Sequence, residues 1–300
     1  MSAPVFHSAE AIARALPPAA AVDALEAALR GGLDPDADPP RSSATAEGGE
    51  LLLMPSAAGG LGVKLVTVAP GNADRGLPRI QGIYVLFDPE TLAPAALLDG
   101  IGLTDVRTSA VSALAVRHLA ARPPRRLVVL GTGPQARAHV RALQATAPLE
   151  HVALVGRDRG RTEALARELG AQPATADAVA GADVVCCCTT AREPLFDGDA
   201  VAAEATVVAI GSHEPGAREV DEWLVARATV VVESRATALR EAGDVIAAIE
   251  AGAIGPEALH ELAAVVRGEL PPAPGRPRLF KSTGMAWEDL VLAAAVHARA

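Results

Sequence analysis

Residues 127–136 read Leu-Val-Val-Leu-Gly-Thr-Gly-Pro-Gln-Ala, and this stretch decides the fold. Its four apolar residues predict a buried strand, and the segment after them predicts a helix. The spacing of Gly131, Gly133 and Ala136 matches the G-x-G-x-x-[GA] fingerprint of a dinucleotide-binding βαβ unit. A second apolar strand, at 152–155, follows after about twenty residues, as the fingerprint requires. We therefore expect a dinucleotide cofactor here rather than a plain turn.

Each small residue of the motif has a physical role. Gly131 permits a tight turn, Gly133 lets the backbone approach the pyrophosphate, and Ala136 keeps the helix close to the strand. The negative pyrophosphate would then lie at the N-terminus of the helix, where backbone amides point outward. The expected cofactor contacts in this segment are Gly131, Thr132, Gly133, Pro134, Gln135 and Ala136.

From Arg126 onward, apolar strands alternate with helical segments. We expect strands at 127–130, 152–155, 184–188, 207–210 and 230–232, with helices at 135–145, 161–169 and 219–226. This alternation is typical of a parallel, doubly wound sheet. The predicted fold class is therefore α/β, with a Rossmann dinucleotide-binding domain over residues 122–285.

The first hundred residues have a different pattern. Four strands are expected at 51–54, 63–68, 83–87 and 95–98, with no helix between them. Such a succession favours an antiparallel or mixed sheet. Residues 1–121 and 286–300 are therefore expected to form an α+β domain that binds the substrate and joins two subunits.

Helices and loops complete the predicted order of elements. Two short helices are expected within 8–30, and Thr104 is expected to cap a helix that runs to about Ala121. A Pro-rich loop should extend to Gly48. Two or three helices are expected within 234–267, then a linker at 271–277 and a final amphipathic helix at 287–300.

The composition is that of an ordinary globular protein. Half of the 300 residues are apolar, and the formal net charge is −9. A chain of this length favours two domains. The negative charge and the 2% aromatic content argue against a nucleic-acid partner, because phosphates need a basic surface and bases stack on aromatic side chains. No apolar run reaches the roughly 18 residues that would predict a membrane span.

The three cysteines are consecutive, at Cys186, Cys187 and Cys188. Neighbouring side chains on a strand point to opposite faces, so these thiols suit neither a disulfide nor a tetrahedral metal site. We expect them to be small buried residues of a reducing compartment, and we expect no metal site. The N-terminus shows no basic stretch followed by an apolar core, so the cytoplasm is the expected location.

The end of the second strand predicts the choice of nicotinamide cofactor. NAD enzymes usually carry Asp or Glu there, which accepts from the ribose 2′-hydroxyl and repels a 2′-phosphate. In this chain the position is Gly156, and Arg157 and Arg161 follow as cationic partners for a phosphate. NADP(H) is therefore the preferred cofactor, with NAD(H) as the alternative if Asp158 takes the role of the missing acid.

Six blocks along the chain add to this reading. They are Gly-Val-Lys-Leu-Val at 62–66, Gly-Leu-Pro-Arg-Ile-Gln-Gly at 76–82, Asp-Gly at 99–100 with Leu-Thr at 103–104 and Arg-Thr-Ser at 107–109, the motif at 131–136, Ala-Ile-Gly-Ser-His at 209–213 and Lys-Ser-Thr-Gly at 281–284. In this order they resemble the ornithine cyclodeaminase/μ-crystallin family, over roughly Arg41 to Val296. The resemblance implies a homodimer whose N-terminal region and last helix form the substrate and dimerisation domain.

The resemblance also implies that Arg41, Lys64 and Arg107 hold the substrate α-carboxylate against the nicotinamide. The residues themselves agree with this chemistry. Lys64 lies mid-strand between apolar neighbours, where an unpaired charge is costly. Arg107 is expected in the first turn of its helix, where a cation opposes the helix dipole and so requires an anion. A structural ion pair is the alternative for both Lys64 and Arg107, and a solvated side chain is the alternative for Arg41.

Other expected cofactor contacts lie where strands end or where the resemblance points. Two threonines follow the strand at 184–188, at the carboxyl edge where ligands of such sheets bind. The block 281–284 matches family positions that close over the nicotinamide. Arg79 stands where relatives usually have Thr or Ser, and its alternative is exposure to solvent. These remaining contacts are Arg79, Arg107, Thr189, Thr190, Gly211, Ser282 and Thr283.

Two departures from the family pattern bear on the reaction. Cyclodeaminases that this chain resembles carry an Asp where it has His213, and a Glu where it has Leu52. Deamination needs anionic groups near a cationic substrate, so both losses argue against ornithine cyclisation. Lys64 or His213 is the expected proton donor, because burial tunes either group toward neutrality. For His213, a helix-capping or loop histidine beside the cofactor is an equal alternative.

We therefore predict an NADPH-dependent reductase of cyclic ketimino acids. Its substrates would be Δ1-pyrroline-2-carboxylate and Δ1-piperideine-2-carboxylate, and its products proline and pipecolate. The alternatives are another reaction of the family, namely alanine-type reductive amination, opine-type synthesis or cyclodeamination, or a non-catalytic NADPH-binding protein. An intact pair of Lys64 and Arg107 favours the enzyme, because a pure binder has no need of a carboxylate clamp.

Overall fold

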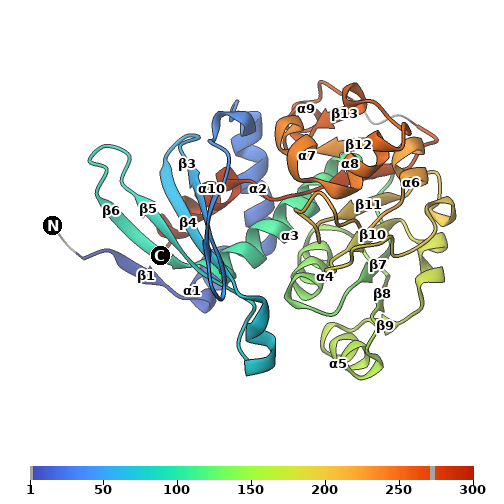
Figure 1. The fold of residues 1–300 in the computed structure, drawn as a ribbon, viewed down its shortest axis with the longest axis horizontal. Coiled ribbons are helices and arrows are strands. Elements are labelled where there is room, and N and C mark those ends of the chain that lie inside the picture. Colours follow the sequence, from blue (N-terminus) through green and yellow to red (C-terminus); the bar gives the residue numbers. More distant parts are fainter. Residues whose placement is uncertain (1–2, 271–273) are drawn as a thin grey trace. The chain divides into compact units, whose positions relative to one another are not determined.

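The structure is a computed structural model that describes residues 3–270 and 274–300 (Figure 1). The expected linker at 271–277 therefore lies partly outside the described residues. The chain divides into two compact units. A central unit comprises Thr108–Gly284, and a flanking unit comprises Met1–Arg107 together with Met285–Ala300. The division falls within helix α3 (Gly100–Leu119), so that the two halves of this helix belong to different units.

The central unit is built on a parallel sheet of eight strands in the order β13-β12-β14-β11-β10-β7-β8-β9. From β7 the chain moves outward to β8 and β9, then returns to the other side of β7 with β10 and β11. The order therefore reverses between β7 and β10, as in doubly wound folds. The strands are β7 (Arg126–Leu130), β8 (His151–Val155), β9 (Gln172–Pro173), β10 (Val184–Cys187), β11 (Thr206–Ala209), β12 (Thr229–Val232), β13 (Leu259–Glu261) and β14 (Arg278–Lys281).

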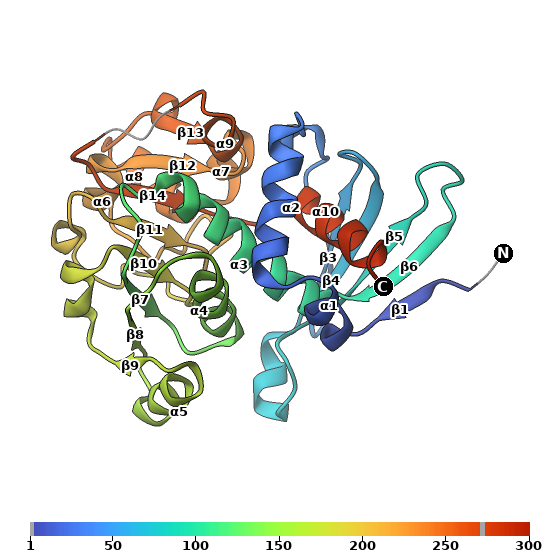
Figure 2. The same ribbon diagram turned by 180° about the vertical axis from the view of Figure 1, so that it is seen from behind.

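Helices cover both faces of this sheet (Figures 1 and 2). Alternate strand residues such as Val128, Val185 and Val207 form one apolar cluster with side chains of α6 and α8. The other face packs against α4. The helices are α4 (Pro134–Thr146), α5 (Arg159–Leu169), α6 (Glu222–Arg227), α7 (Arg235–Glu241), α8 (Gly243–Glu250) and α9 (Leu262–Val266), with short 3-10 helices at Ala176–Gly181, Gly198–Ala200 and Pro256–Ala258. Burial on both faces explains the continuous apolar runs of the strands.

The flanking unit contains a mixed sheet of six strands in the order β1-β6-β5-β4-β3-β2. Only β1 pairs in parallel, with β6. Helix α10 contacts β3, β4 and β5 and also packs against α2 (Figure 2). The elements are β1 (Val5–His7), β2 (Ser42–Ala46), β3 (Gly49–Ser56), β4 (Leu61–Val68), β5 (Ile80–Phe87), β6 (Pro94–Asp99), α1 (Ala9–Ala15), α2 (Pro18–Arg30) and α10 (Ala286–His297), with 3-10 helices at Pro35–Ala37 and Pro70–Arg75.

The predicted α/β class and Rossmann domain are confirmed, but several predicted elements are wrong in detail. The expected loop up to Gly48 contains strand β2, which pairs with β3. All five residues of β2 are exposed, so the strand lacks the apolar alternation by which strands are found. Strands β1, β9, β13 and β14 were also not predicted. Each has four residues or fewer, too short for a clear period.

Two predicted helix starts are wrong because an acid caps the helix elsewhere. Helix α3 begins at Gly100 rather than Thr104, since the Asp99 carboxylate accepts from the amides of Ile101 and Gly102. Arg107 therefore lies two turns inside α3, and the argument that placed it against the helix dipole does not hold. Helix α6 begins at Glu222, capped by Asp221, and the expected first residue, Glu219, lies before it.

Within the described residues, no helix combines the length and the apolar character needed to cross a membrane.

Candidate functional site

Lys64 lies at the centre of the flanking sheet, on the face covered by α10. It pairs across the sheet with Met54 of β3 and Tyr84 of β5, and all three side chains are buried. The strand period places Lys64 on the same buried face as Val66, and the Lys64 side chain is buried there to its end. A buried ammonium needs a counter-ion, because removal from water costs far more than a surface charge does.

Two adjacent acids of α10 supply counter-ions to Lys64 and Arg107. The Lys64 ammonium donates to Asp289 Oδ2 at 2.7 Å and to Thr104 Oγ1 at 3.3 Å. Arg107 donates through Nη1 to Glu288 Oε2 at 3.0 Å, and its Nε lies 3.8 Å from Asp289 Oδ1. Both carboxylates are fully buried. Asp289 thus joins the two cations, and Glu288 lies in the same buried cluster.

This cluster changes the acidity of Lys64. Burial lowers the pKa of the Lys64 ammonium to about 8, with the neighbouring Arg107 acting in the same direction and Asp289 opposing it. Near neutral pH the group is therefore mostly charged yet able to give up a proton. A lysine with these properties can both bind a carboxylate and serve as a general acid.

The other residues predicted in this unit lie on loops. Arg41 is half-buried and immediately precedes β2. Arg79 is exposed and immediately precedes β5. The structure thus brings Lys64 and Arg107 to a shared partner. Sequence reasoning missed that partner, Asp289, and its neighbour Glu288, although two adjacent acids in an otherwise apolar helix were a signal that could have found them.

In the central unit, the glycine motif follows β7 and opens α4. Gly131 has φ +127, and a Cβ added to it would overlap the carbonyl of Cys188. Gly133 is the N-cap of α4, and an added Cβ there would meet nothing within 4 Å. Ala136 is fully buried. Open space in front of a helix N-terminus, beside a turn that only glycine can make, suits a pyrophosphate group.

Gly156, at the end of β8, has no room for a side chain. A Cβ there would overlap Thr162 Oγ1 and lie 2.5 Å from Thr132 Cγ2. A side chain at this position would require Thr132 and Thr162 to move, so the local packing disfavours an acid for the ribose 2′-hydroxyl here. The Asp158 carboxylate caps α5 by accepting from the amide of Arg161 at 2.9 Å, so it is committed to the helix.

Arg157 and Arg161 flank this turn and are both exposed. Among the residues that the structure describes, neither forms an ion pair. Their guanidinium groups are thus available to an anion at the end of β8, where the adenosine ribose of a bound dinucleotide lies in such folds.

The remaining predicted cofactor residues lie at the carboxyl ends of the other strands, and two buried glutamates hold most of them. Glu219 accepts from the amide and the hydroxyl of Thr189, each at 2.7 Å, and from the Gly211 amide at 2.7 Å. Glu233 accepts from the Ser282 hydroxyl at 2.7 Å and from the Thr283 amide at 2.9 Å. Thr190 and His213, which follow β10 and β11, are exposed. The expectation that burial tunes the His213 imidazole is therefore wrong, because this side chain is in contact with solvent.

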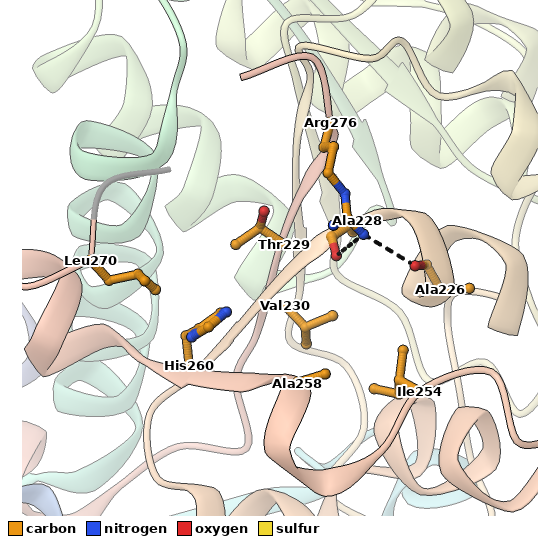
Figure 3. A pocket seen from close by; sticks show the side chains of 9 residues that line it. All are labelled: Ala226, Ala228, Thr229, Val230, Ile254, Ala258, His260, Leu270 and Arg276. Atoms are coloured by element: carbon orange, nitrogen blue, oxygen red, sulfur yellow. Dashed lines mark hydrogen bonds between the residues drawn. The ribbon is translucent and has the colours of Figure 1, made fainter. Parts of the chain in front are cut away.

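The central unit also has a hollow of about 250 Å³, which lies away from the carboxyl ends of the strands (Figure 3). It lies at the amino ends of β12 and β13, with His260 on one side and Arg276 on another. The Arg276 guanidinium donates to the carbonyls of Ala226 and Ala228. None of the residues predicted to bind cofactor or substrate lines this hollow.

Several known proteins are similar to this chain in sequence and in structure. A Δ(1)-pyrroline-2-carboxylate reductase of Bacillus cereus is 36% identical over 267 residues, covering 83% of this chain and 81% of the relative. The ketimine reductase mu-crystallin of Rattus norvegicus is 36% identical over 243 residues, covering 79% and 75%. The structure of Thermococcus litoralis Δ(1)-pyrroline-2-carboxylate reductase in complex with NADH and L-proline superposes with a TM-score of 0.90 at 28% identity, covering 98% of this chain and 97% of the other.

The sequence profile of one family matches residues 3–300, nearly the whole chain. The resemblance that the six blocks carry is thereby confirmed. The chain belongs to the ornithine cyclodeaminase/mu-crystallin family.

Proposed function

We propose that this protein is an NADPH-dependent reductase of cyclic ketimino acids, which converts Δ1-pyrroline-2-carboxylate and Δ1-piperideine-2-carboxylate to L-proline and L-pipecolate. The chain is a nicotinamide-dependent oxidoreductase acting on imines, as its family and its reductase relatives indicate. The observation that carries the finer proposal is the buried pair of Lys64 and Arg107, tied together by Asp289.

The glycine motif and the turn after β8 support the cofactor assignment. Residues Gly131 to Ala136 and the N-terminus of α4 would hold the pyrophosphate. Arg157 and Arg161 would hold a 2′-phosphate, because the two guanidinium groups are free of ion pairs in the described structure and Gly156 excludes a repelling acid. The Thermococcus relative was solved with NADH, so the preference for NADPH rests on these residues of this chain alone. When bound, the nicotinamide supplies the hydride.

Lys64, Arg107 and Arg41 would bind the carboxylate of the substrate. Two cations fixed by Glu288 and Asp289 lose little conformational freedom when an anion arrives, so the substrate ring is oriented at low entropic cost. Reduction places a hydride on the imine carbon and a proton on the imine nitrogen. Lys64 is the proposed proton donor, since the pKa of its ammonium is lowered to about 8. His213, directly or through water, is the alternative donor.

The flanking unit would also join two subunits. Strand β1 lies at the edge of the six-stranded sheet, and its residues Val5 and Phe6 are 55% and 57% exposed. An edge strand with large exposed apolar side chains is a surface that proteins usually cover. This supports the proposed homodimer.

A panel of NADPH-oxidation assays tests the proposed reaction. The substrates are the two cyclic imines, pyruvate with ammonia and pyruvate with methylamine. Ornithine with NADP+ is tested separately by the release of ammonia, because cyclodeamination causes no net reduction of the cofactor. We expect oxidation with the cyclic imines to exceed that with the pyruvate mixtures by at least about tenfold in kcat/KM. Turnover of ornithine, or a preference for pyruvate with an amine, would contradict the proposal.

A further inference from the structure

Three charged side chains, Glu219, Asp244 and Lys281, form a buried network at the carboxyl ends of β10, β11 and β14. None of the three is more than 1% exposed. The Lys281 ammonium lies 2.9 Å from Asp244 Oδ2 and donates to the carbonyl of Ser212 at 2.7 Å. Asp244 Oδ1 accepts from the backbone amide of Glu219 at 2.6 Å. The network therefore links α8, which carries Asp244, to the ends of three strands.

The carboxylate of Glu219 is the part of the network that touches the predicted cofactor loops. It takes three donors at 2.7 Å, namely the amide and hydroxyl of Thr189 and the amide of Gly211. A Cβ on Gly211 would overlap both the Thr189 carbonyl and the Glu219 carboxylate. The loops after β10 and β11 are therefore drawn together around one buried anion.

Burial of this network costs desolvation free energy, and its location in the sheet indicates a function that offsets this cost. Buried ion pairs are often no more stabilising than apolar residues of the same volume, because each charge must leave water. Here three charges are buried in one place, immediately beside the point where the strand order reverses. In doubly wound folds the adenosine half of a dinucleotide lies on the side of the first two strands, here β7 and β8, and the nicotinamide half lies over the strands beyond the reversal, here β10 and β11.

We propose that Glu219 is a positioning residue for the nicotinamide half of the cofactor. With Asp244 and Lys281 behind it, its carboxylate sets the spacing and orientation of the loops that begin at Thr189 and Gly211. The amide and hydroxyl of Thr189 and the amide of Gly211 point to Glu219, so these loops serve the cofactor through their shape and their other atoms. The inference rests on the dinucleotide site of the proposed function but not on the identity of the imine.

The charge of Glu219 is essential to this role. Glutamine has the same size, but its amide nitrogen would face an N–H donor of Thr189 or Gly211 instead of accepting from it. Glu219→Gln should therefore spread the two loops while the rest of the sheet stays packed. Glu219→Asp keeps the charge but shortens the side chain, so it should recover part of the function.

The test compares two ligands by isothermal titration calorimetry on the full-length protein. NADPH spans both halves of the site, and 2′,5′-ADP occupies only the adenosine side. We expect Glu219→Gln to raise the Kd of NADPH by at least about tenfold and to leave the Kd of 2′,5′-ADP within about twofold of its unmutated value. For Glu219→Asp, the Kd of NADPH should lie between that of Glu219→Gln and that of the unmutated protein. Should Glu219→Gln fail to fold, Asp244→Asn carries the same comparison, because it keeps the acceptor for the Glu219 amide but weakens the hold of Lys281.

A matched control comes from the amino ends of the strands, on the side opposite to Glu219. Asp183, just before β10, also accepts three hydrogen bonds, from Arg122 and from the amides of Arg125 and Arg126. Asp183→Asn should lower the melting temperature without changing the ratio of the two Kd values. Equal weakening of NADPH and 2′,5′-ADP by Glu219→Gln, or no weakening of either, would overturn the inference. Failure of the unmutated protein to bind NADPH would instead refute the proposed cofactor, and the comparison would then be made with NADH and AMP.

Discussion

The carboxylate of Asp289 lies 2.7 Å from the ammonium of Lys64, and both side chains are buried. The partners are 225 residues apart in the chain. The predicted substrate cation is therefore also one half of an internal ion pair. The ion pair that was the alternative interpretation of Lys64 is therefore present, and binding of the substrate carboxylate by Lys64 stays a prediction.

This pairing determines what removal of the lysine charge should do. Lys64→Met leaves Asp289 buried without its nearest cation, which typically costs about 3–5 kcal/mol of stability. The double variant Lys64→Met/Asp289→Asn removes both charges and should regain most of the lost melting temperature. If Lys64 binds the substrate carboxylate, kcat/KM should stay about 30- to 1000-fold low in both variants. Recovery of activity together with stability in the double variant would refute the role of Lys64 in catalysis.

The pH dependence of kcat/KM should depend on the same pair, Lys64 and Asp289. Lys64 must be protonated to donate, so activity should fall as the pH rises through its pKa, which is about 8. Asp289 favours the charged lysine and thus raises this pKa. Asp289→Asn should therefore move the alkaline limb of kcat/KM to lower pH. A limb that stays in place, measured with a cyclic imine between pH 6 and 10, would point to a different proton donor.

Arg107 should not tolerate lysine. Its guanidinium contacts Glu288 and approaches Asp289 from different nitrogen atoms, and an ammonium is a single point charge that cannot reproduce this fork. Arg107→Lys is expected to lower kcat/KM by about 10- to 100-fold while the Kd of NADPH changes little. Arg30→Lys, at an exposed ion pair with Glu26, is the matched control and should leave both quantities unchanged.

The cofactor preference should depend on the turn after β8. Arg157→Ala should reduce the ratio of kcat/KM for NADPH to that for NADH by about tenfold or more, mainly through the KM of NADPH, because one charge-assisted contact to the 2′-phosphate is lost. Arg159→Ala tests specificity, since Arg159 is paired with Glu163 and should matter less. A clear preference for NADH in the unmutated protein would contradict the assignment.

The exposed edge of the flanking sheet predicts the assembly. Light scattering at micromolar concentration should give twice the chain mass of 30.5 kDa. Replacing Phe6, which is 57% exposed on edge strand β1, by Glu should weaken the dimer, because a charge on an edge strand opposes pairing. A monomeric unmutated protein would exclude the proposed homodimer.

The sequence alone was sufficient to predict the fold class of the central unit and five of its eight strands. Strands such as 127–130 and 184–187 are continuous apolar runs, and the glycine spacing at 131–136 is a local pattern with a local physical cause. The sequence also shows that Gly156 replaces an expected acid, which is the basis of the predicted preference for NADPH. Short or exposed strands such as β2 escaped because hydrogen bonds to a neighbour, and not apolar side chains, define them.

Only the tertiary structure revealed the partners of the charges. The acids Glu288 and Asp289 meet Lys64 and Arg107 across 181 or more residues of sequence, and Glu219 lies beside Thr189 only because β10 and β11 are neighbours in the sheet. The spacing of residues along the chain does not predict such pairs. Burial is the reason for these pairs, because a charge removed from water requires an opposite charge or a hydrogen-bonding partner, and the tertiary fold determines which group lies close enough.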